Sequence, residues 1–205
     1  LVKISKAKRL LILGVILVVI DQVIKILVKT NMQIGEHFSV IGNWFQIFFI
    51  ENEGMAFGMK FGGAVGKFLL SFFRIALFGV LCWWIASLAR KSVDSSGKPA
   101  VPAGVLVGLT MITAGAFGNI IDSLFYGVIF DYAPLMFGRV VDMFYFPLID
   151  TTWPAWVPFV GGERLLFFAP VFNFADSCVT VGAFYLILFQ NRFFTREAPA
   201  SSDTH

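Results

Sequence analysis

Two aspartates in apolar surroundings are the residues of this sequence best suited to chemistry. Asp142 lies in the apolar run 140–144, and Asp176 lies in the run 172–177. An ionised Asp near hydrocarbon is costly, about 2.5–3.5 kcal/mol at the centre of a membrane helix, so a chain that keeps two is expected to use them. Two carboxylates that share one proton can supply both the acid and the base of a hydrolysis. We expect Asp142 to be hydrogen-bonded or partly protonated, because its neighbours are apolar.

Each of two Asn residues precedes an Asp by three positions. Asn119 and Asp122 form one pair, and Asn173 and Asp176 form the other. Residues three apart share a helix face, so the two pairs are predicted to face each other across a small cleft. A plainer interpretation makes Asn173 an N-cap and Asp176 an acidic residue of the first helical turn. That interpretation leaves Asp142 unexplained.

The elements that position these residues are predicted to be membrane helices. The chain of 205 residues is 58% hydrophobic and has a mean hydropathy of +0.80, whereas soluble domains are about 45–50% apolar. Apolar segments at about 10–28, 68–89, 101–124 and 172–189 are long enough to cross a bilayer. The fold class is therefore a membrane protein, an all-α four-helix transmembrane bundle. The third segment is rich in small residues and is expected at the bundle centre.

The distribution of basic residues predicts the orientation. The net charge is only +3, and basic residues gather near the segment ends, which fits membrane orientation better than nucleic-acid binding. Four spans place the N-terminus, residues 90–100 and the C-terminal tail together on the cytoplasmic side. Residues 29–67 and 125–171 then lie outside. The polar end of the first helix and the start of the fourth should meet at that outer face.

The outer connections are predicted to contain ordered structure. Aromatic and β-branched runs at 38–41 and 44–50 predict short strands, which gives a small extramembrane β-rich element. The Trp- and Pro-rich stretch 145–170 is expected to be an ordered loop at the membrane interface. One membrane domain over 1–192 is the simplest organisation, followed by a disordered cytoplasmic tail at 193–205.

Five short motifs occur in a recognisable order. They are Asp21-Gln22-Val23-Ile24-Lys25, Asn52-Glu53-Gly54-Met55-Ala56-Phe57-Gly58, Gly118-Asn119-Ile120-Ile121-Asp122, Val140-Val141-Asp142-Met143-Phe144 and Phe172-Asn173-Phe174-Ala175-Asp176-Ser177. Each motif is weak alone, but the ordered series resembles the lipoprotein signal peptidase (signal peptidase II) family. The resemblance covers about residues 8–192.

The resemblance implies an intramembrane aspartic endopeptidase of the bacterial inner membrane. Such an enzyme removes the signal peptide from diacylglyceryl-modified prolipoproteins, cutting before the lipidated cysteine, near the periplasmic face. It implies membrane lipids as neighbours and inhibition by cyclic peptides such as globomycin. No cofactor or metal is expected, and a monomer suffices for the chemistry. The catalytic pair falls on Asp142 and Asp176. The supporting and substrate-binding residues fall on Asp21, Asn52, Gly54, Asn119, Asp122 and Asn173.

The sequence departs from the family pattern at two places. Ser123 stands where the family usually has Arg after the Asp of the third motif, and Arg139 or Arg164 could replace that Arg. Asp142 and Asp176 are 34 positions apart, where a shorter link is commoner. The proposed mechanism needs both carboxylates within reach of one water. Our expectation is that Asp142, nearer the outer water, starts ionised and Asp176 starts protonated.

A small proton- or ion-coupled transporter is the alternative. Intramembrane Asp residues also serve as proton or cation relays, and Arg74 in the second span could pair with one of them. The simpler role for Arg74 is snorkelling or pairing within the bundle. Grouping of the acids at one membrane face and the lack of an inverted repeat favour the peptidase. No His accompanies the acids, which argues against zinc.

Overall fold

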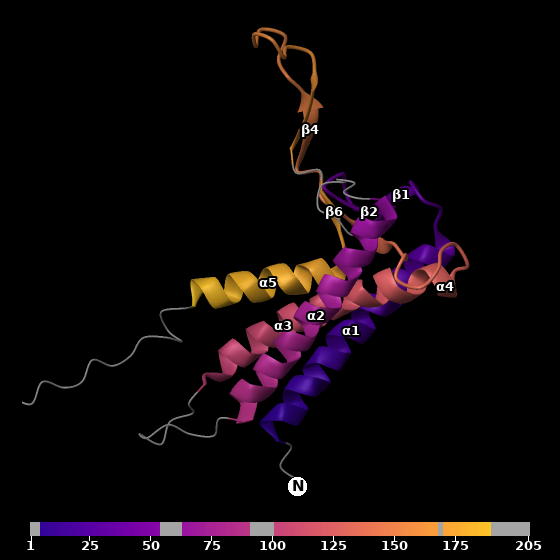
Figure 1. The fold of residues 1–205 in the computed structure, drawn as a ribbon. Coiled ribbons are helices and arrows are strands. Elements are labelled where there is room, and N and C mark those ends of the chain that lie inside the picture. Colours follow the sequence, from indigo (N-terminus) through magenta and orange to yellow (C-terminus); the bar gives the residue numbers. More distant parts are fainter. Residues whose placement is uncertain (1–4, 54–62, 91–100, 168–169, 190–205) are drawn as a thin grey trace, which may run out of the picture.

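Three long apolar helices form the body of the molecule (Figure 1). The computed structural model describes residues 5–53, 63–90, 101–167 and 170–189. Within these ranges, α1 (Lys6–Asn31), α2 (Gly63–Arg90) and α3 (Ala103–Ile121) with its continuation to Ile129 are long and apolar enough to cross a membrane. The first three predicted spans are therefore confirmed as helices, with α1 and α2 longer than expected.

The outward faces of these helices are apolar. Val15 on α1 and Phe72 and Trp83 on α2 are among the exposed large side chains. A helix that is hydrophobic nearly all round is stable where its outer face meets lipid. Ser5 caps the start of α1 by accepting a hydrogen bond from the Lys8 amide.

The fourth predicted span is a shorter helix than expected. Among the described residues, α5 (Phe174–Leu188) has 15 residues, which is about 22 Å at 1.5 Å per residue. A bilayer core is about 30 Å thick. The structure thus shows three helices of spanning length and one shorter apolar helix, and the four-span count is not confirmed.

The third helix lies at the centre of the bundle, as its small residues predicted. It packs against α1, α2 and α5. Gly115 allows α3 and α5 to approach each other closely, because a Cβ there would lie 2.3 Å from the backbone oxygen of Ala175 on α5. The missing side chain lets α5 start directly against α3.

A four-stranded antiparallel sheet lies beyond one end of the helices (Figure 1). Its order is β1 (His37–Ile41), β2 (Phe45–Asn52), β3 (Val140–Tyr145) and β6 (Val171–Phe172). The strands expected at 38–41 and 44–50 are confirmed. The sequence reading assigned no strand to 140–145, because its run of buried side chains lacks the alternation of a half-exposed strand.

The stretch predicted as an ordered loop contains a β-hairpin. Strands β4 (Ile149–Thr152) and β5 (Arg164–Phe167) pair with each other in a separate two-stranded sheet. Figure 1 shows this hairpin projecting away from the helices, past the four-stranded sheet. Trp156 and Phe159 at its turn are exposed.

Between α3 and the sheet the helix widens. Helix α3 runs directly into a π-helical turn, η2 (Asp122–Tyr126), and then into α4 (Gly127–Ile129). Such turns are uncommon and occur often at functional sites. This one begins at Asp122, one of the predicted site residues.

Candidate active site

Asp142 lies at the centre of the sheet with two amide donors. It faces Ile50 across the β2–β3 pairing and is 2% exposed. Asn173 Nδ2 donates to its Oδ1 atom over 2.7 Å, and Asn52 Nδ2 donates to its Oδ2 atom over 3.3 Å. The expectation that Asp142 needs hydrogen bonds is confirmed.

Asp176 lies in the first turn of α5 and is only half-buried. Asn119 Nδ2 donates to its Oδ1 atom over 2.8 Å. Its Oδ2 atom accepts from the Asn173 amide at 3.2 Å, and its own amide donates to Asn173 Oδ1 at 2.9 Å. Asn173 and Asp176 therefore form a capping box, which confirms the plainer interpretation of this pair.

Asn173 also joins the two aspartates. Its side-chain nitrogen donates to Asp142 and its backbone nitrogen donates to Asp176, so one residue contacts both carboxylates. The 34 positions between them are closed by the sheet, since Phe144 on β3 pairs with Phe172 on β6, one residue before Asn173. The structure thus brings the predicted pair together.

The surroundings of Asp142 favour its protonated form. Burial and the neighbouring charge of Asp176 together raise the pKa of Asp142 to about 7, while hydrogen bonds from Asn173 and Asn52 and the charge of Lys25 oppose the rise. Asp142 is also the more deeply buried of the two acids. The expectation that Asp142 lies nearer water is wrong, because strand β3 places it inside the sheet. Its expected ionised start stays a prediction, and the raised pKa points the other way.

A buried lysine organises the other two acids. Lys25 is 0% exposed, and its Nζ atom lies 2.9 Å from Asp21 and 2.8 Å from Asp122. It also donates to Asn119 Oδ1 over 2.8 Å, and that oxygen accepts from Asn173 Nδ2 at 3.1 Å. The two predicted Asn-x-x-Asp pairs therefore do meet, and Lys25 connects them to α1.

Each of these acids also holds backbone. Asp21 Oδ1 accepts from the Ala175 amide at 2.9 Å, and Asp122 Oδ2 accepts from the Val141 amide at 3.2 Å. One bond fixes the residue before Asp176, and the other fixes the residue before Asp142. Asp21 and Asp122 thus position the two segments that carry the candidate dyad.

The sequence reading did not select Lys25, Gln22 or Tyr126 as site residues. Gln22 Nε2 donates to Asp21 and Asp122, and its Oε1 accepts from the Tyr126 hydroxyl at 3.1 Å. A lysine four positions after an Asp inside an apolar helix was the available signal, since an unpaired charge there is too costly to keep. Tyr126 had no comparable signal.

The arginine that contacts Ser123 is Arg74. It is not one of the two candidates predicted from the sequence, Arg139 and Arg164. Its Nη1 atom donates to Ser123 Oγ over 3.3 Å. Arg139 pairs instead with Glu51 at 3.3 Å, and Arg164 begins strand β5 of the projecting hairpin. The interpretation of Arg74 as pairing within the bundle is confirmed by its contact with Ser123.

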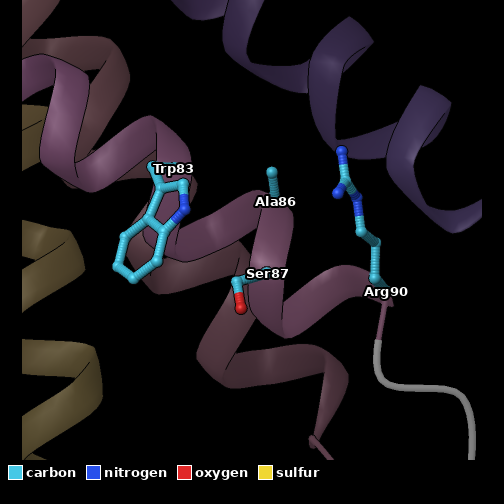
Figure 2. Close-up of a pocket in the computed structure, with 4 residues that line it drawn as sticks. All are labelled: Trp83, Ala86, Ser87 and Arg90. Carbon is cyan, nitrogen blue, oxygen red and sulfur yellow. The ribbon is translucent and has the colours of Figure 1, made fainter.

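The remaining predicted site residue, Gly54, falls outside the described residues. A hollow of about 330 Å³ is lined by Trp83, Ala86, Ser87 and Arg90, all on α2 (Figure 2). None of the candidate site residues contributes to it, so it is a feature of the helix surface separate from the dyad.

Comparisons with known proteins identify the family of this chain. The model of the signal peptidase (SPase) II family matches residues 13–192. The chain belongs to the signal peptidase II family. It is 47% identical over 189 residues to the lipoprotein signal peptidase of Porphyromonas gingivalis, which covers 85% of this chain and 79% of that protein. It is 38% identical over 184 residues to the lipoprotein signal peptidase of Amoebophilus asiaticus, covering 86% and 75%.

Solved structures support the fold of this signal peptidase II family member. One, described as a bacterial membrane enzyme, is 24% identical, covers 94% of each chain and has a TM-score of 0.58. A second with the same description has the same score and identity and covers 89% of this chain. Together with the family membership, the three long apolar helices make the protein a membrane protein.

Proposed function

We propose that the protein is an intramembrane aspartic endopeptidase that removes the signal peptide from diacylglyceryl-modified prolipoproteins, cutting before the lipidated cysteine. The family membership supports the reaction. The observation that carries the assignment of Asp142 and Asp176 as the catalytic pair is the double contact of Asn173, which holds both carboxylates at one place.

One proton shared between the carboxylates is enough for the reaction. The ionised carboxylate takes a proton from water while the water oxygen attacks the scissile carbonyl carbon. The protonated carboxylate gives its proton to the carbonyl oxygen, which forms a neutral tetrahedral diol. As the C–N bond breaks, one carboxyl protonates the leaving amine and the other recovers a proton from the diol. The raised pKa of Asp142 supports Asp142 as the initial acid and Asp176 as the initial base.

Six residues take supporting roles in this proposal. Asn173, Asn119 and Asn52 donate to the dyad and fix the direction of its lone pairs. Asp21 and Asp122 hold the backbone beside it. Gly54 is assigned to substrate binding on the resemblance alone.

The proposed placement in the membrane keeps the four-span topology. We assign α5 as the fourth span, with both termini cytoplasmic, the dyad near the periplasmic face of the inner membrane, and residues 1–192 as one domain. The position of Lys8, Arg9 and Arg90 at the end of the bundle opposite the sheet supports this orientation. The tail at 193–205 lies outside the described residues and is assigned to the cytoplasm. A reporter that works only in the cytoplasm should be active when it is fused after residue 192.

The proposed partners follow from the reaction. They are prolipoproteins, the surrounding lipids and cyclic-peptide inhibitors such as globomycin, and a monomer is sufficient for the chemistry. Globomycin should block cleavage at concentrations that leave the protein folded. Cleavage that persists at saturating inhibitor would contradict its binding at this site.

The decisive experiment is cleavage of a purified diacylglyceryl-modified prolipoprotein by the full chain in detergent. Asp142→Asn and Asp176→Asn should each abolish cleavage, because an amide can neither give nor take the required proton. Asp131→Asn is the matched control, since Asp131 is exposed and its φ of 53° is one that Asn tolerates. Full activity of either dyad variant would overturn the mechanism. Ion flux in liposomes without cleavage would favour the transporter.

A further inference from the structure

Arg74 is a charged residue in an otherwise apolar part of a membrane helix. It lies on the inward-facing side of α2, where Ser71 is buried and Arg74 and Phe78 are half-buried. Their neighbours Phe72 and Phe73 are exposed. A guanidinium at such a position is costly unless it meets a partner inside the bundle.

The structure provides such partners. Arg74 Nη1 donates to Ser123 Oγ over 3.3 Å, and Ser123 Oγ donates to the backbone oxygen of Asn119 over 2.9 Å. Asn119 in turn donates to Asp176. Arg74 also interacts electrostatically with Asp176 itself. The guanidinium therefore lies on the Asp176 side of the candidate dyad.

Lys25, the fully buried cation among the described residues, already has two acidic partners. Lys25 lies between Asp21 and Asp122, so one positive charge faces two carboxylates. Lys67, on the same helix as Arg74, interacts with Glu53 and Glu51. Among the described residues, the charged groups linked to the dyad by these contacts and interactions are Asp21 and Lys25 from α1, Arg74 from α2 and Asp122 from η2. Lys25 acts on Asp142, and Arg74 interacts with Asp176.

We propose that Arg74 is a positioning residue for the reaction: its guanidinium, held by Ser123, keeps the negative charge of the dyad on Asp176 and leaves the proton on Asp142. An opposite charge nearby favours the ionised form of a carboxyl. The raised pKa of Asp142 has the same direction. This inference rests on the proposed function of the dyad.

The test separates the charge of Arg74 from its hydrogen bonds. Rates of prolipoprotein cleavage are measured from pH 4 to pH 9 for the wild type, Arg74→Lys and Arg74→Gln. Both replacements can donate hydrogen bonds, but only Lys carries a charge. In Arg74→Gln the acid limb of the kcat profile should move up by about one pH unit, because Asp176 loses the cation that favours its ionised form. At pH values below that limb, the kcat of Arg74→Gln should be about tenfold lower than that of the wild type, and KM should hardly change.

Arg90→Gln is the matched control, since Arg90 is the last residue of the same helix and lines the separate hollow on α2 (Figure 2). Its pH profile should match the wild type. A second test moves the cation: Ser123→Arg added to Arg74→Ser should return the acid limb toward its wild-type position. Thermal unfolding in detergent shows which variants are folded.

Three results would overturn the inference. One is a wild-type acid limb in folded Arg74→Gln, and another is an equal loss of kcat at every pH. The third is an acid limb of the Arg74→Lys profile that is displaced by a full pH unit. This result decides the test if Arg74→Gln does not fold. Failure of the dyad itself is recognised separately, because Asp142→Asn or Asp176→Asn would then remain active whatever Arg74 does.

Discussion

Asn173 donates its side-chain amide to Asp142 over 2.7 Å from the N-cap position of α5. One residue therefore both starts the helix that carries Asp176 and orients the carboxylate of Asp142. The stability of α5 and the geometry of the dyad depend on the same side chain, but on different atoms of it.

Those two roles can be separated by substitution. Asn173→Ser keeps an oxygen that can cap α5 but removes the amide donor, so cleavage should fall strongly while thermal unfolding in detergent changes little. Asn173→Ala should lower activity and also cost about 0.5–2 kcal/mol of stability, because the cap is lost. Equal unfolding temperatures for the two variants would argue against the capping role, and wild-type activity of Asn173→Ser would argue against the orienting role.

Lys25 should be essential for folding. Lys25→Met leaves Asp21 and Asp122 without their buried cation, and breaking such a group costs about 3–5 kcal/mol. Thermal unfolding in detergent measures the loss. Adding Asp122→Asn to Lys25→Met should recover part of it, since one uncompensated charge is removed. Lys8→Met is the control, because Lys8 is exposed near the start of α1, and its unfolding temperature should equal that of the wild type.

The close contact of α3 with α5 should be sensitive to a single methyl group. Gly115→Ala places a Cβ 2.3 Å from the Ala175 oxygen, so α5 must shift and Asp176 shifts with it. We expect at least a tenfold loss of cleavage, since small misplacements at a reacting centre are costly, up to about 100-fold for 1 Å. Gly79→Ala on α2 meets nothing within 4 Å and should keep full activity. Similar activity of the two variants would contradict the packing account.

The buried carboxyl of Asp142 predicts how stability varies with pH. Its folded-state pKa of about 7 lies above the ordinary value of 3.8, so the folded protein binds this proton more tightly than the unfolded chain. The stabilising contribution is complete below about pH 4, declines as the pH rises and is lost once the pH passes about 7. Unfolding temperatures from pH 4 to pH 8 should therefore fall more steeply in the wild type than in Asp142→Asn, which cannot ionise. Parallel curves would show that Asp142 keeps an ordinary pKa.

Local patterns in the sequence carried much of the fold. Three apolar segments, two strands and the central position of the glycine-rich helix followed from hydropathy, β-branched runs and small residues. The candidate dyad and its Asn partners followed from motifs. These features are predictable because each depends on neighbours within a few positions, and polar residues in apolar segments are conspicuous.

Features that depend on distant partners were not predictable. Strand β3 looked like any buried apolar run, and only its pairing with β2 reveals how deeply Asp142 is enclosed. That burial raises the pKa of Asp142, against the expectation that this residue starts ionised. Arg74 and Ser123 are 49 positions apart and lie on different helices, so the sequence pattern did not predict their contact. The length of α5 depended on where its helical hydrogen bonds end, which hydropathy does not reveal.

The pairing of β3 with β6 makes the segment between them a natural point for growth of the chain. Phe144 with Phe172 and Tyr145 with Val171 hold both ends of this segment together, and β4 and β5 pair only with each other. Sequence can therefore lengthen, shorten or diverge there without altering the spacing of the acids. For protein engineering, the turn of the projecting hairpin is accordingly the place to insert an epitope or a small reporter domain while retaining catalysis.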